Sequence, residues 1–355
     1  MSSFKVKGFP WAHGIGKNVS DCNTAAEVMD KAGLNFTVDK CPVVAKMPFR
    51  IGSNNELNEY NGDFSYGGDI YRSVSDCYAT YRTDLNIPLG MVGAKYEVVQ
   101  NRDAFSFFDD AIGKDKAQWE YAGLFGAGHK IYIAAKLPAD IDVKGDPVSN
   151  YLVFSNSHDG SSSVDVMFTP IRMFCINCLS SAINSASSAI RLKHTKTVNE
   201  RLEYGKRILA SAIQYAENTK QLYEALAVAK LSDETVMQYI TRLVLTDDEI
   251  TRALEFGGDH PYNKLVEGNW YVKTKAEIST RKINKLASIW DYYQNGPGQD
   301  RIVGTAWGAY NSITGYFANI ANTEGEKRMD GLVWGSASRS MRTALSDVIE
   351  LAETA

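Results

Sequence analysis

The apolar residues of this chain change their spacing near the middle of the sequence, and this change constrains the fold more than any other feature. Between Ser75 and Leu137 they alternate with polar residues, which is typical of strands in a sheet with one wet face. Beyond Val198 they recur every three to four residues, which is typical of amphipathic helices. The sequence therefore predicts an α+β fold: a twisted antiparallel sheet with hairpins in the N-terminal half, followed by a largely α-helical C-terminal half.

The same change of spacing predicts how the chain is divided. We expect residues 1–197 to form a β-rich core with an N-terminal loop region, and residues 198–355 to form a helical region packed on this core. One continuous domain is the alternative, because 355 residues with 44% hydrophobic content can bury either one large core or two smaller ones.

Residues 151–207 join the two halves. They begin with two apolar runs separated by a polar loop at Asp159-Gly160, which predicts a β-hairpin with a longer connection. We expect a helix directly afterwards, because Thr169 can cap it, Pro170 suits its first position, and apolar residues follow at helical spacing.

One cation interrupts the apolar stripe of this expected helix. Arg172 would lie on the apolar side, at the end where the helix dipole disfavours a positive charge. Two interpretations stay open: a structural arginine matched by a buried carboxylate, or a phosphate ligand at the junction of sheet and helix. A basic cluster follows, with six Lys or Arg against two Glu between Arg191 and Arg207, and a second cluster has five against one between Lys273 and Lys285.

The strand predicted from Lys130 to Lys136 carries the other candidate binding residues. Its alternation places both lysines and Tyr132 on one face, opposite Ile131 and Ile133. This face could follow a phosphate backbone with its lysines and stack a base on the tyrosine, or it could be an ordinary solvated face. The expected nucleic-acid site consists of Lys130, Tyr132, Lys136, Arg172, Lys193, Lys196, Arg201 and Arg207.

Charge and cysteine content limit the classes of function. A formal net charge of −4 excludes a uniformly basic nucleic-acid binder but leaves room for a local basic groove. Of five cysteines, Cys175 and Cys178 have the C-x-x-C spacing, but nothing completes a set of four zinc ligands, so we expect no metal, no disulfide and no cofactor. Without a signal peptide or a long apolar segment, we expect a cytoplasmic protein that does not contact a membrane.

A glycine-containing helix with several aromatic residues is expected between Gly304 and Phe317. Trp307, Tyr310 and Tyr316 lie on it. Aromatic residues at helical spacing commonly fill a core, but they can also anchor an interface between copies of a chain. We expect a homo-oligomer, in which this helix either fills the core or supplies anchors of the interface.

Five segments of the sequence occur in an order that is specific in combination. They are FPWAHGIG, YRTDLNIPLGMVGAKYEVVQN, FTPIRMFCINCLSSAI, GTAWGAYNSITGYF and DGLVWGSASRSMRTAL. This combination resembles the phage and plasmid family known as "domain of unknown function 932", although the first segment departs from the family's W-H-G-[LI]-G by an inserted Ala12. The resemblance implies a mobile-element protein working in a bacterial cytoplasm and supplies no activity. A more distant likeness, at the level of a twisted antiparallel sheet joined to helices, is to phage single-strand annealing proteins of the Red beta and RecT kind.

Three functions are compatible with these observations. The first is a non-catalytic protein that binds single-stranded DNA as a ring or filament and promotes annealing in recombination or replication. The second is a host-interaction protein, including an inhibitor of bacterial defence. The third is a metal-dependent nuclease, although no spacing singles out a pair of carboxylates to hold Mg²⁺. The candidate carboxylates are Asp76, Asp84, Glu97, Asp109, Asp110 and Asp165. We expect binding rather than catalysis.

Overall fold

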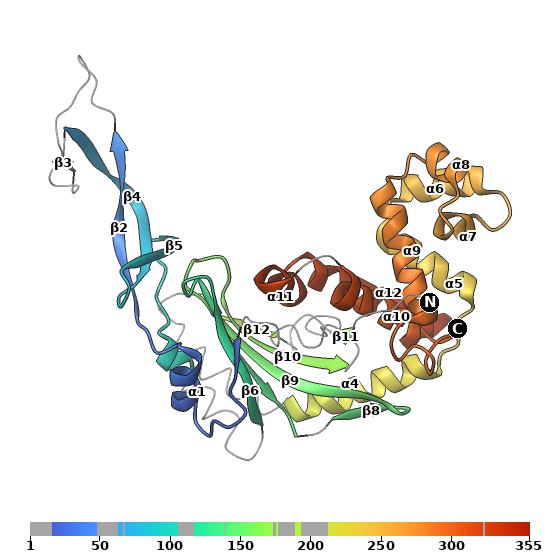
Figure 1. Ribbon diagram of the computed structural model, residues 1–355, viewed down its shortest axis with the longest axis horizontal. Coiled ribbons are helices and arrows are strands. Elements are labelled where there is room, and N and C mark those ends of the chain that lie inside the picture. The colour runs from blue at the N-terminus through green and yellow to red at the C-terminus, as the bar shows by residue number, and fades with distance from the viewer. Residues whose placement is uncertain are drawn as a thin grey trace.

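The computed structural model describes residues 16–47, 63–66, 68–105, 117–138, 140–172, 175–176, 189–192, 212–321 and 324–355 (Figure 1). Antiparallel strands fill the N-terminal half of these residues, and helices fill the C-terminal half. The predicted α+β class is therefore confirmed. Within the described ranges, no helix is both long and apolar enough to span a bilayer.

An antiparallel sheet forms the centre of the molecule, and the described residues contribute eight strands to it. The strand order is β1-β6-β7-β9-β10-β11, with β8 paired to β9 and β12 paired to β10. The hairpin between β8 and β9 turns through Lys144 and Gly145, whose φ angles of 54° and 86° are those of a type I′ turn. The strands are β1 (Gly16–Asn18), β6 (Gln118–Phe125), β7 (Lys130–Lys136), β8 (Ile141–Val143), β9 (Asp146–Ser157), β10 (Val164–Arg172), β11 (Cys175–Ile176) and β12 (Ala189–Leu192).

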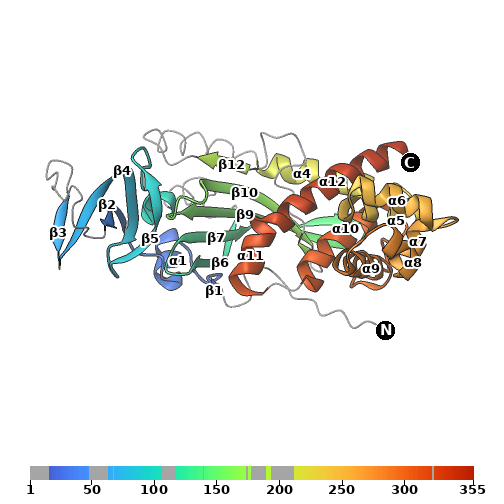
Figure 2. The same ribbon diagram turned by 90° about the horizontal axis from the view of Figure 1, so that it is seen from above.

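Both faces of this sheet are covered. Ile131, Ile133 and Phe154 belong to a core on one face, which includes the buried residues of α1 (Ala25–Ala32). On the other face, Tyr132 and Val153 contact α11 (Gly325–Val333) and α12 (Ser336–Thr354), and Figures 1 and 2 show α11 lying across the strands. The two halves of the chain therefore share a core.

A second antiparallel sheet projects from the body as a ribbon, seen at the left of Figure 1. Its long strand β4 (Asp69–Arg82) pairs on one side with β2 (Val38–Met47) and on the other with β3 (Phe64–Tyr66) and β5 (Ile87–Gly93).

The base of the ribbon is fixed to the β9–β10 hairpin of the main sheet. Thr80 Oγ1 donates to the carbonyl of His158 at 2.6 Å, and Tyr96 Oη donates to the carbonyl of Ser157 at 2.8 Å. A Cβ on Gly90 would collide with the backbone of Asp159, so this close approach requires glycine. The ribbon therefore has a defined attachment to the body.

The C-terminal half consists of helices that begin at capping residues such as Ser232, Asn269, Ser279 and Thr305. Thr246 and Glu249 form a complete capping box at α6. The helices before α11 are α4 (Ala212–Val228), α5 (Asp233–Val244), α6 (Asp247–Gly257), α7 (Pro261–Val266), α8 (Trp270–Lys275), α9 (Thr280–Asn295), α10 (Ala306–Gly315) and the π-helix η3 (Tyr316–Ile320).

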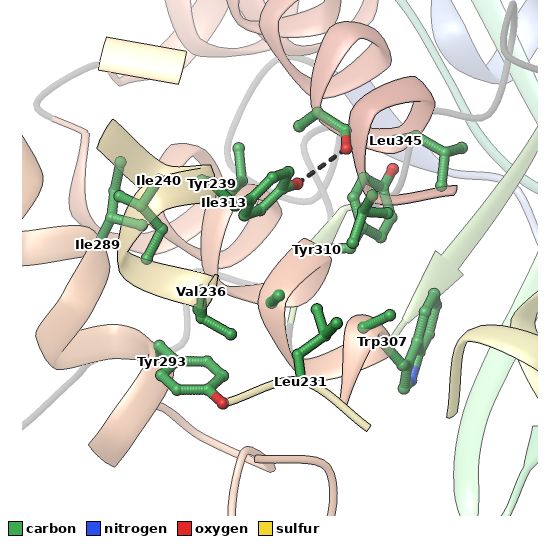
Figure 3. Close-up of a cluster of buried hydrophobic side chains, with 14 of the residues drawn as sticks. Leu231, Val236, Tyr239, Ile240, Ile289, Tyr293, Trp307, Tyr310, Ile313 and Leu345 are labelled. Carbon is green, nitrogen blue, oxygen red and sulfur yellow. Dashed lines mark hydrogen bonds between the residues drawn. The ribbon is translucent and has the colours of Figure 1, made fainter. Parts of the chain in front are cut away.

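The aromatic residues of α10 fill the core of this helical half (Figure 3). Trp307 and Tyr310 are 0% exposed, and Trp307 Nε1 donates to Asp146 Oδ2 of β9 at 2.8 Å. Tyr239 Oη donates to the carbonyl of Ala344 at 2.8 Å, which joins α5 to α12. The interpretation that this aromatic helix fills a core is therefore confirmed for Trp307 and Tyr310.

The expectation of a helix directly after Thr169 is wrong. Strand β10 continues through Thr169 and Pro170 to Arg172, and these residues pair with Tyr151, Asn150 and Val148 of β9. Pro170 lies between the segments of β10 that pair with β12 and β11, and among the described residues no strand other than β9 pairs with it. Pairing with β9 therefore overrides the local helix signal. Cys175 lies in β11 rather than in a helix, and Cys178 lies outside the described residues.

Candidate nucleic-acid interface

The strand face expected to bind nucleic acid is not exposed. Tyr132 is 0% exposed and contacts the apolar residues that α11 and α12 lay across the sheet. Burial raises the pKa of its phenol far above the ordinary value. The expectation that this ring lies free to stack on a base is therefore wrong, because residues nearly 200 positions later in the chain cover it.

The two lysines of the same strand have carboxylate partners. Lys130 Nζ lies 2.9 Å from Asp330 Oδ1 of α11 and 5.7 Å from the centroid of the Trp334 ring. Glu326, also on α11, accepts a hydrogen bond at 2.9 Å from the backbone N–H of Gly126. Lys130 therefore helps to hold α11 on the sheet, while Lys136 pairs with Asp140 at 3.3 Å near the surface.

The remaining predicted site residues are not brought together by the part of the chain that the structure describes. Arg172 ends β10, where its backbone lies opposite Val148 and Cys175. Its side chain lies outside the described part, as do Lys193, Lys196, Arg201 and Arg207 in full. The convergence of these cations on one groove stays a prediction.

Helix α8 exposes two aromatic side chains. Asn269 caps it by accepting from the backbone N–H groups of Tyr271 and Val272 at 3.1 and 3.2 Å, and Val272 is its buried residue. Trp270 is 74% exposed and Tyr271 is 50% exposed. A large exposed aromatic pair contributes little to folding, so it points to a binding surface.

Cations accompany these rings along α8. Lys273 follows Trp270 by three residues and Lys275 follows Tyr271 by four, which are the spacings that bring helix side chains onto one side. Lys273 Nζ also donates to Thr280 Oγ1 at 2.7 Å, which links the end of α8 to the first residue of α9.

Helix α9 carries two cations away from its packed side. Ile283, Leu286 and Ile289 are buried in the helical core, while Arg281 is exposed and Lys285 lies one turn further on. Lys285 Nζ lies 4.9 Å from the centroid of the Phe317 ring and 5.8 Å from that of Tyr316. Burial, and then the charge of Arg281, lower the pKa of the Lys285 ammonium below its ordinary value.

The π-helix η3 presents the two rings that contact Lys285. A Cβ on Gly315, the residue before η3, would collide with the Tyr292 ring, so glycine permits α9 and η3 to approach closely. Asn319 Nδ2 donates to Tyr292 Oη at 3.1 Å and fixes the end of the same turn. Single turns of π-helix are frequent at functional sites.

Lys273 links α8 to α9, and Lys285 links α9 to η3. We call the cations and aromatic rings of these three elements the aromatic–basic track. Among the described residues, no carboxylate forms an ion pair with Arg281 or Lys285. Glu249 of α6 pairs instead with Lys282 of α9, at 2.6 Å. The track consists of Trp270, Tyr271, Lys273, Arg281, Lys285, Tyr316 and Phe317.

The sequence indicated the cations of this track, and Tyr316 as a possible interface anchor, but not Trp270 and Tyr271. The excess of basic residues between Lys273 and Lys285 was the available signal. Trp270 and Tyr271 belong to a helix of six residues, which is too short for apolar spacing to show which side is buried.

The described carboxylates among those considered for a metal do not gather into a centre, while Asp109 and Asp110 lie outside the described residues. Asp84 pairs with Arg82 at 2.7 Å, and Asp165 is buried in β10, where it accepts from Ser163 Oγ at 2.8 Å. Over the described ranges, no three Cys, His, Asp or Glu side chains lie close enough together to hold a metal ion.

Comparison with known proteins identifies one family. The sequence profile described as "Domain of unknown function (DUF932)" matches residues 88–334, which is more than half of the chain. No curated protein and no solved structure shows significant similarity to the chain.

Proposed function

The chain belongs to the family described as domain of unknown function (DUF932), and because that membership supplies no activity, we propose from the aromatic–basic track that the protein binds single-stranded DNA. It does so without cleaving the strand, promotes annealing, and acts as a phage- or plasmid-encoded protein in a bacterial cytoplasm. The observation that carries the proposal is the exposed pair Trp270 and Tyr271 on α8. Arg281 and Lys285 lie on α9, the next helix of the chain.

The chemistry of the track suits an unpaired strand better than a duplex. Lysine and arginine contact phosphates without regard to sequence, and aromatic rings stack on bases whose faces are free. The bases of a duplex are already stacked on each other, so exposed rings such as Trp270 gain little from it. Binding should therefore favour single strands and tolerate any sequence.

Lys285 adds a second line of support. Its ammonium is partly withdrawn from water against two rings, and among the described residues it has no carboxylate to compensate its charge. The ammonium has already lost part of its hydration in the free protein, so binding an anion does not add that desolvation cost. The new ion pair therefore contributes favourably to the free energy of binding. A phosphate placed over Arg281 and Lys285 would supply that anion.

The overall charge of the chain is compatible with this site. The formal net charge is −4, whereas residues 264–285 contain six Lys or Arg against two Glu. A basic stretch on an otherwise acidic protein directs a polyanion to one surface. Since this attraction is electrostatic, it should weaken steeply as salt increases.

Fluorescence anisotropy with a labelled oligothymidylate and a duplex of equal length, each over a salt series, tests the proposal. We expect tight binding of the single strand at low salt, a steep loss of affinity with salt, and weaker binding of the duplex. The Arg281→Ala variant should lower the salt slope, while the control variant Lys220→Ala removes one charge from α4 and should not. Absence of single-strand binding, or cleavage of the probe on addition of Mg²⁺, would overturn the proposal.

Annealing is tested separately with two complementary labelled strands. Wild-type protein should accelerate the loss of donor fluorescence as the strands pair, and Trp270→Ala should slow it. A protein that binds single strands but does not change the pairing rate would remove annealing from the proposal and leave the binding site in place.

A further inference from the structure

The ribbon exposes a face that none of the described residues covers. Its outer part is poor in buried residues: Ile70 is buried in β4, while β3 and the segment of β2 beyond Cys41 have none. A two- or three-stranded sheet without a packed face is only marginally stable in water. Figures 1 and 2 both show this part extending away from the body.

Parts of the ribbon's edges are blocked against strand addition. The Gln100 side chain donates to the carbonyl of Val38 and accepts from its N–H, at 2.8 and 3.1 Å. Pro42 has no N–H to offer, and the register of β2 shifts immediately after it. On the far side of β4, Asp63 accepts from the backbone N–H of Ser73 at 3.1 Å. These contacts favour a partner that uses a face of the ribbon over one that adds a strand to an edge.

One of these faces carries an aromatic cluster. Phe64 lies opposite Tyr71, and their rings stack with centroids 4.9 Å apart and planes 6° from parallel. Lys46 lies opposite Tyr71 on the other side, and Tyr66 lies opposite Asp69, so all these side chains share the face. Tyr66 is 75% exposed. We call this surface the aromatic face of the ribbon; it consists of Val44, Lys46, Phe64, Tyr66, Asp69 and Tyr71.

The charges of the aromatic face are balanced. It carries one cation, Lys46, and one anion, Asp69, which lie 2.6 Å apart within the chain. A face with one charge of each sign does not attract a polyanion, but it is complementary to a copy of itself turned by a two-fold axis. In that arrangement Lys46 of one copy can face Asp69 of the other.

We propose that the aromatic face of the ribbon is where a second copy of this chain docks. The two ribbons lie face to face as two layers of a sandwich, about 10 Å apart, with Phe64, Tyr66 and Tyr71 between them. The charged pair at the border sets the register. The proposal does not depend on DNA binding, because no residue of the aromatic–basic track takes part.

Two charge variants test the proposal by sedimentation velocity. Wild-type protein should sediment as a dimer of the 39.3 kDa chain at concentrations where the Lys46→Glu and Asp69→Lys variants, each alone, are monomers. Each variant gives its face charges of one sign, so like charges meet across the two-fold axis. An equimolar mixture of the two variants should form a heterodimer, because opposite charges then meet.

A second pair of variants separates the aromatic contact from general surface effects. Tyr66→Ser should raise the dimer dissociation constant at least tenfold, whereas Leu254→Ser, which alters a side chain 46% exposed on α6, should leave it unchanged. Circular dichroism verifies that all variants are folded. Wild-type protein that stays monomeric at every concentration, charge variants that dimerise as wild type does, or a mixture that does not associate would each overturn the proposal.

Discussion

Replacing Lys285 by methionine separates a binding lysine from a structural one. Methionine keeps the length and apolar character of the side chain and removes the charge that lies 4.9 Å from the Phe317 centroid. Two effects on stability oppose each other. The cation–π contact is lost, at a cost of about 0.5–2 kcal/mol, and the penalty of holding an ammonium partly out of water disappears. We therefore expect the free energy of unfolding, measured by urea titration, to change by less than about 1 kcal/mol.

DNA affinity should respond to the same substitution. Each phosphate contact on a single strand contributes about 0.7 to the slope of log Kobs against log salt concentration, which corresponds to about fivefold in affinity at 0.1 M salt. Anisotropy titrations of Lys285→Met should show that loss and a slope lower by about 0.7. A fall in unfolding free energy of more than about 2 kcal/mol, with the affinity of the folded protein unchanged, would show that Lys285 is a structural residue and does not contact DNA.

The pH dependence of stability has a definite sign. Because the pKa of Lys285 is lower in the folded chain than its ordinary value of 10.5, its charge destabilises the folded state. This penalty is complete below the folded-state pKa and disappears as the pH rises to 10.5. The free energy of unfolding of wild type relative to Lys285→Met should therefore rise as the pH increases toward 10.5, and a fall with pH would contradict the assignment.

Three further substitutions test other parts of the structure. Trp270→Ala should weaken single-strand binding by about 1–3 kcal/mol in anisotropy titrations and leave the melting temperature unchanged, and an equal loss with duplex DNA would contradict base stacking. Gly315→Ala should lower the unfolding free energy by about 1–3 kcal/mol in urea titrations, because the new methyl group collides with the Tyr292 ring, and a neutral result would contradict that close approach. Tyr132→Ala should cost about 3–5 kcal/mol of stability, as for other large core side chains, without changing the DNA affinity of the folded protein, and a lower affinity with retained stability would return Tyr132 to the site.

The spacing of apolar residues predicted the elements better than it predicted their surroundings. Alternation along β7 correctly indicated a strand, but the same pattern does not say whether the second face is wet. Lys130 and Lys136 lie at the two ends of the strand, where long side chains can reach past a covering layer, whereas Tyr132 lies near its middle. The cover is α11, whose contacts with β7 span 200 positions of sequence, and no local pattern records them.

The error at Thr169-Pro170 has a different physical cause. Threonine followed by proline and then by apolar residues at helical spacing is a sound signal for the start of a helix. In β10 the same residues continue a ladder with β9 that extends from Asp165 to Arg172. The hydrogen bonds and cross-strand contacts of eight paired positions outweigh a local preference of a few tenths to about 1 kcal/mol per residue.

The two proposals concern opposite ends of the molecule and can fail independently. Figures 1 and 2 show the ribbon at one end of the main sheet and α8 at the other, so a dimer joined through two ribbons would hold its two aromatic–basic tracks far apart. A short oligonucleotide could then occupy only one track and should bind wild type and Lys46→Glu equally well. A strand long enough to span both tracks should bind the dimeric wild type more tightly, because attachment to the first track raises the effective concentration at the second. Equal affinity of long strands for both proteins would mean that the ribbons do not bring two tracks onto one strand, even if each track binds DNA.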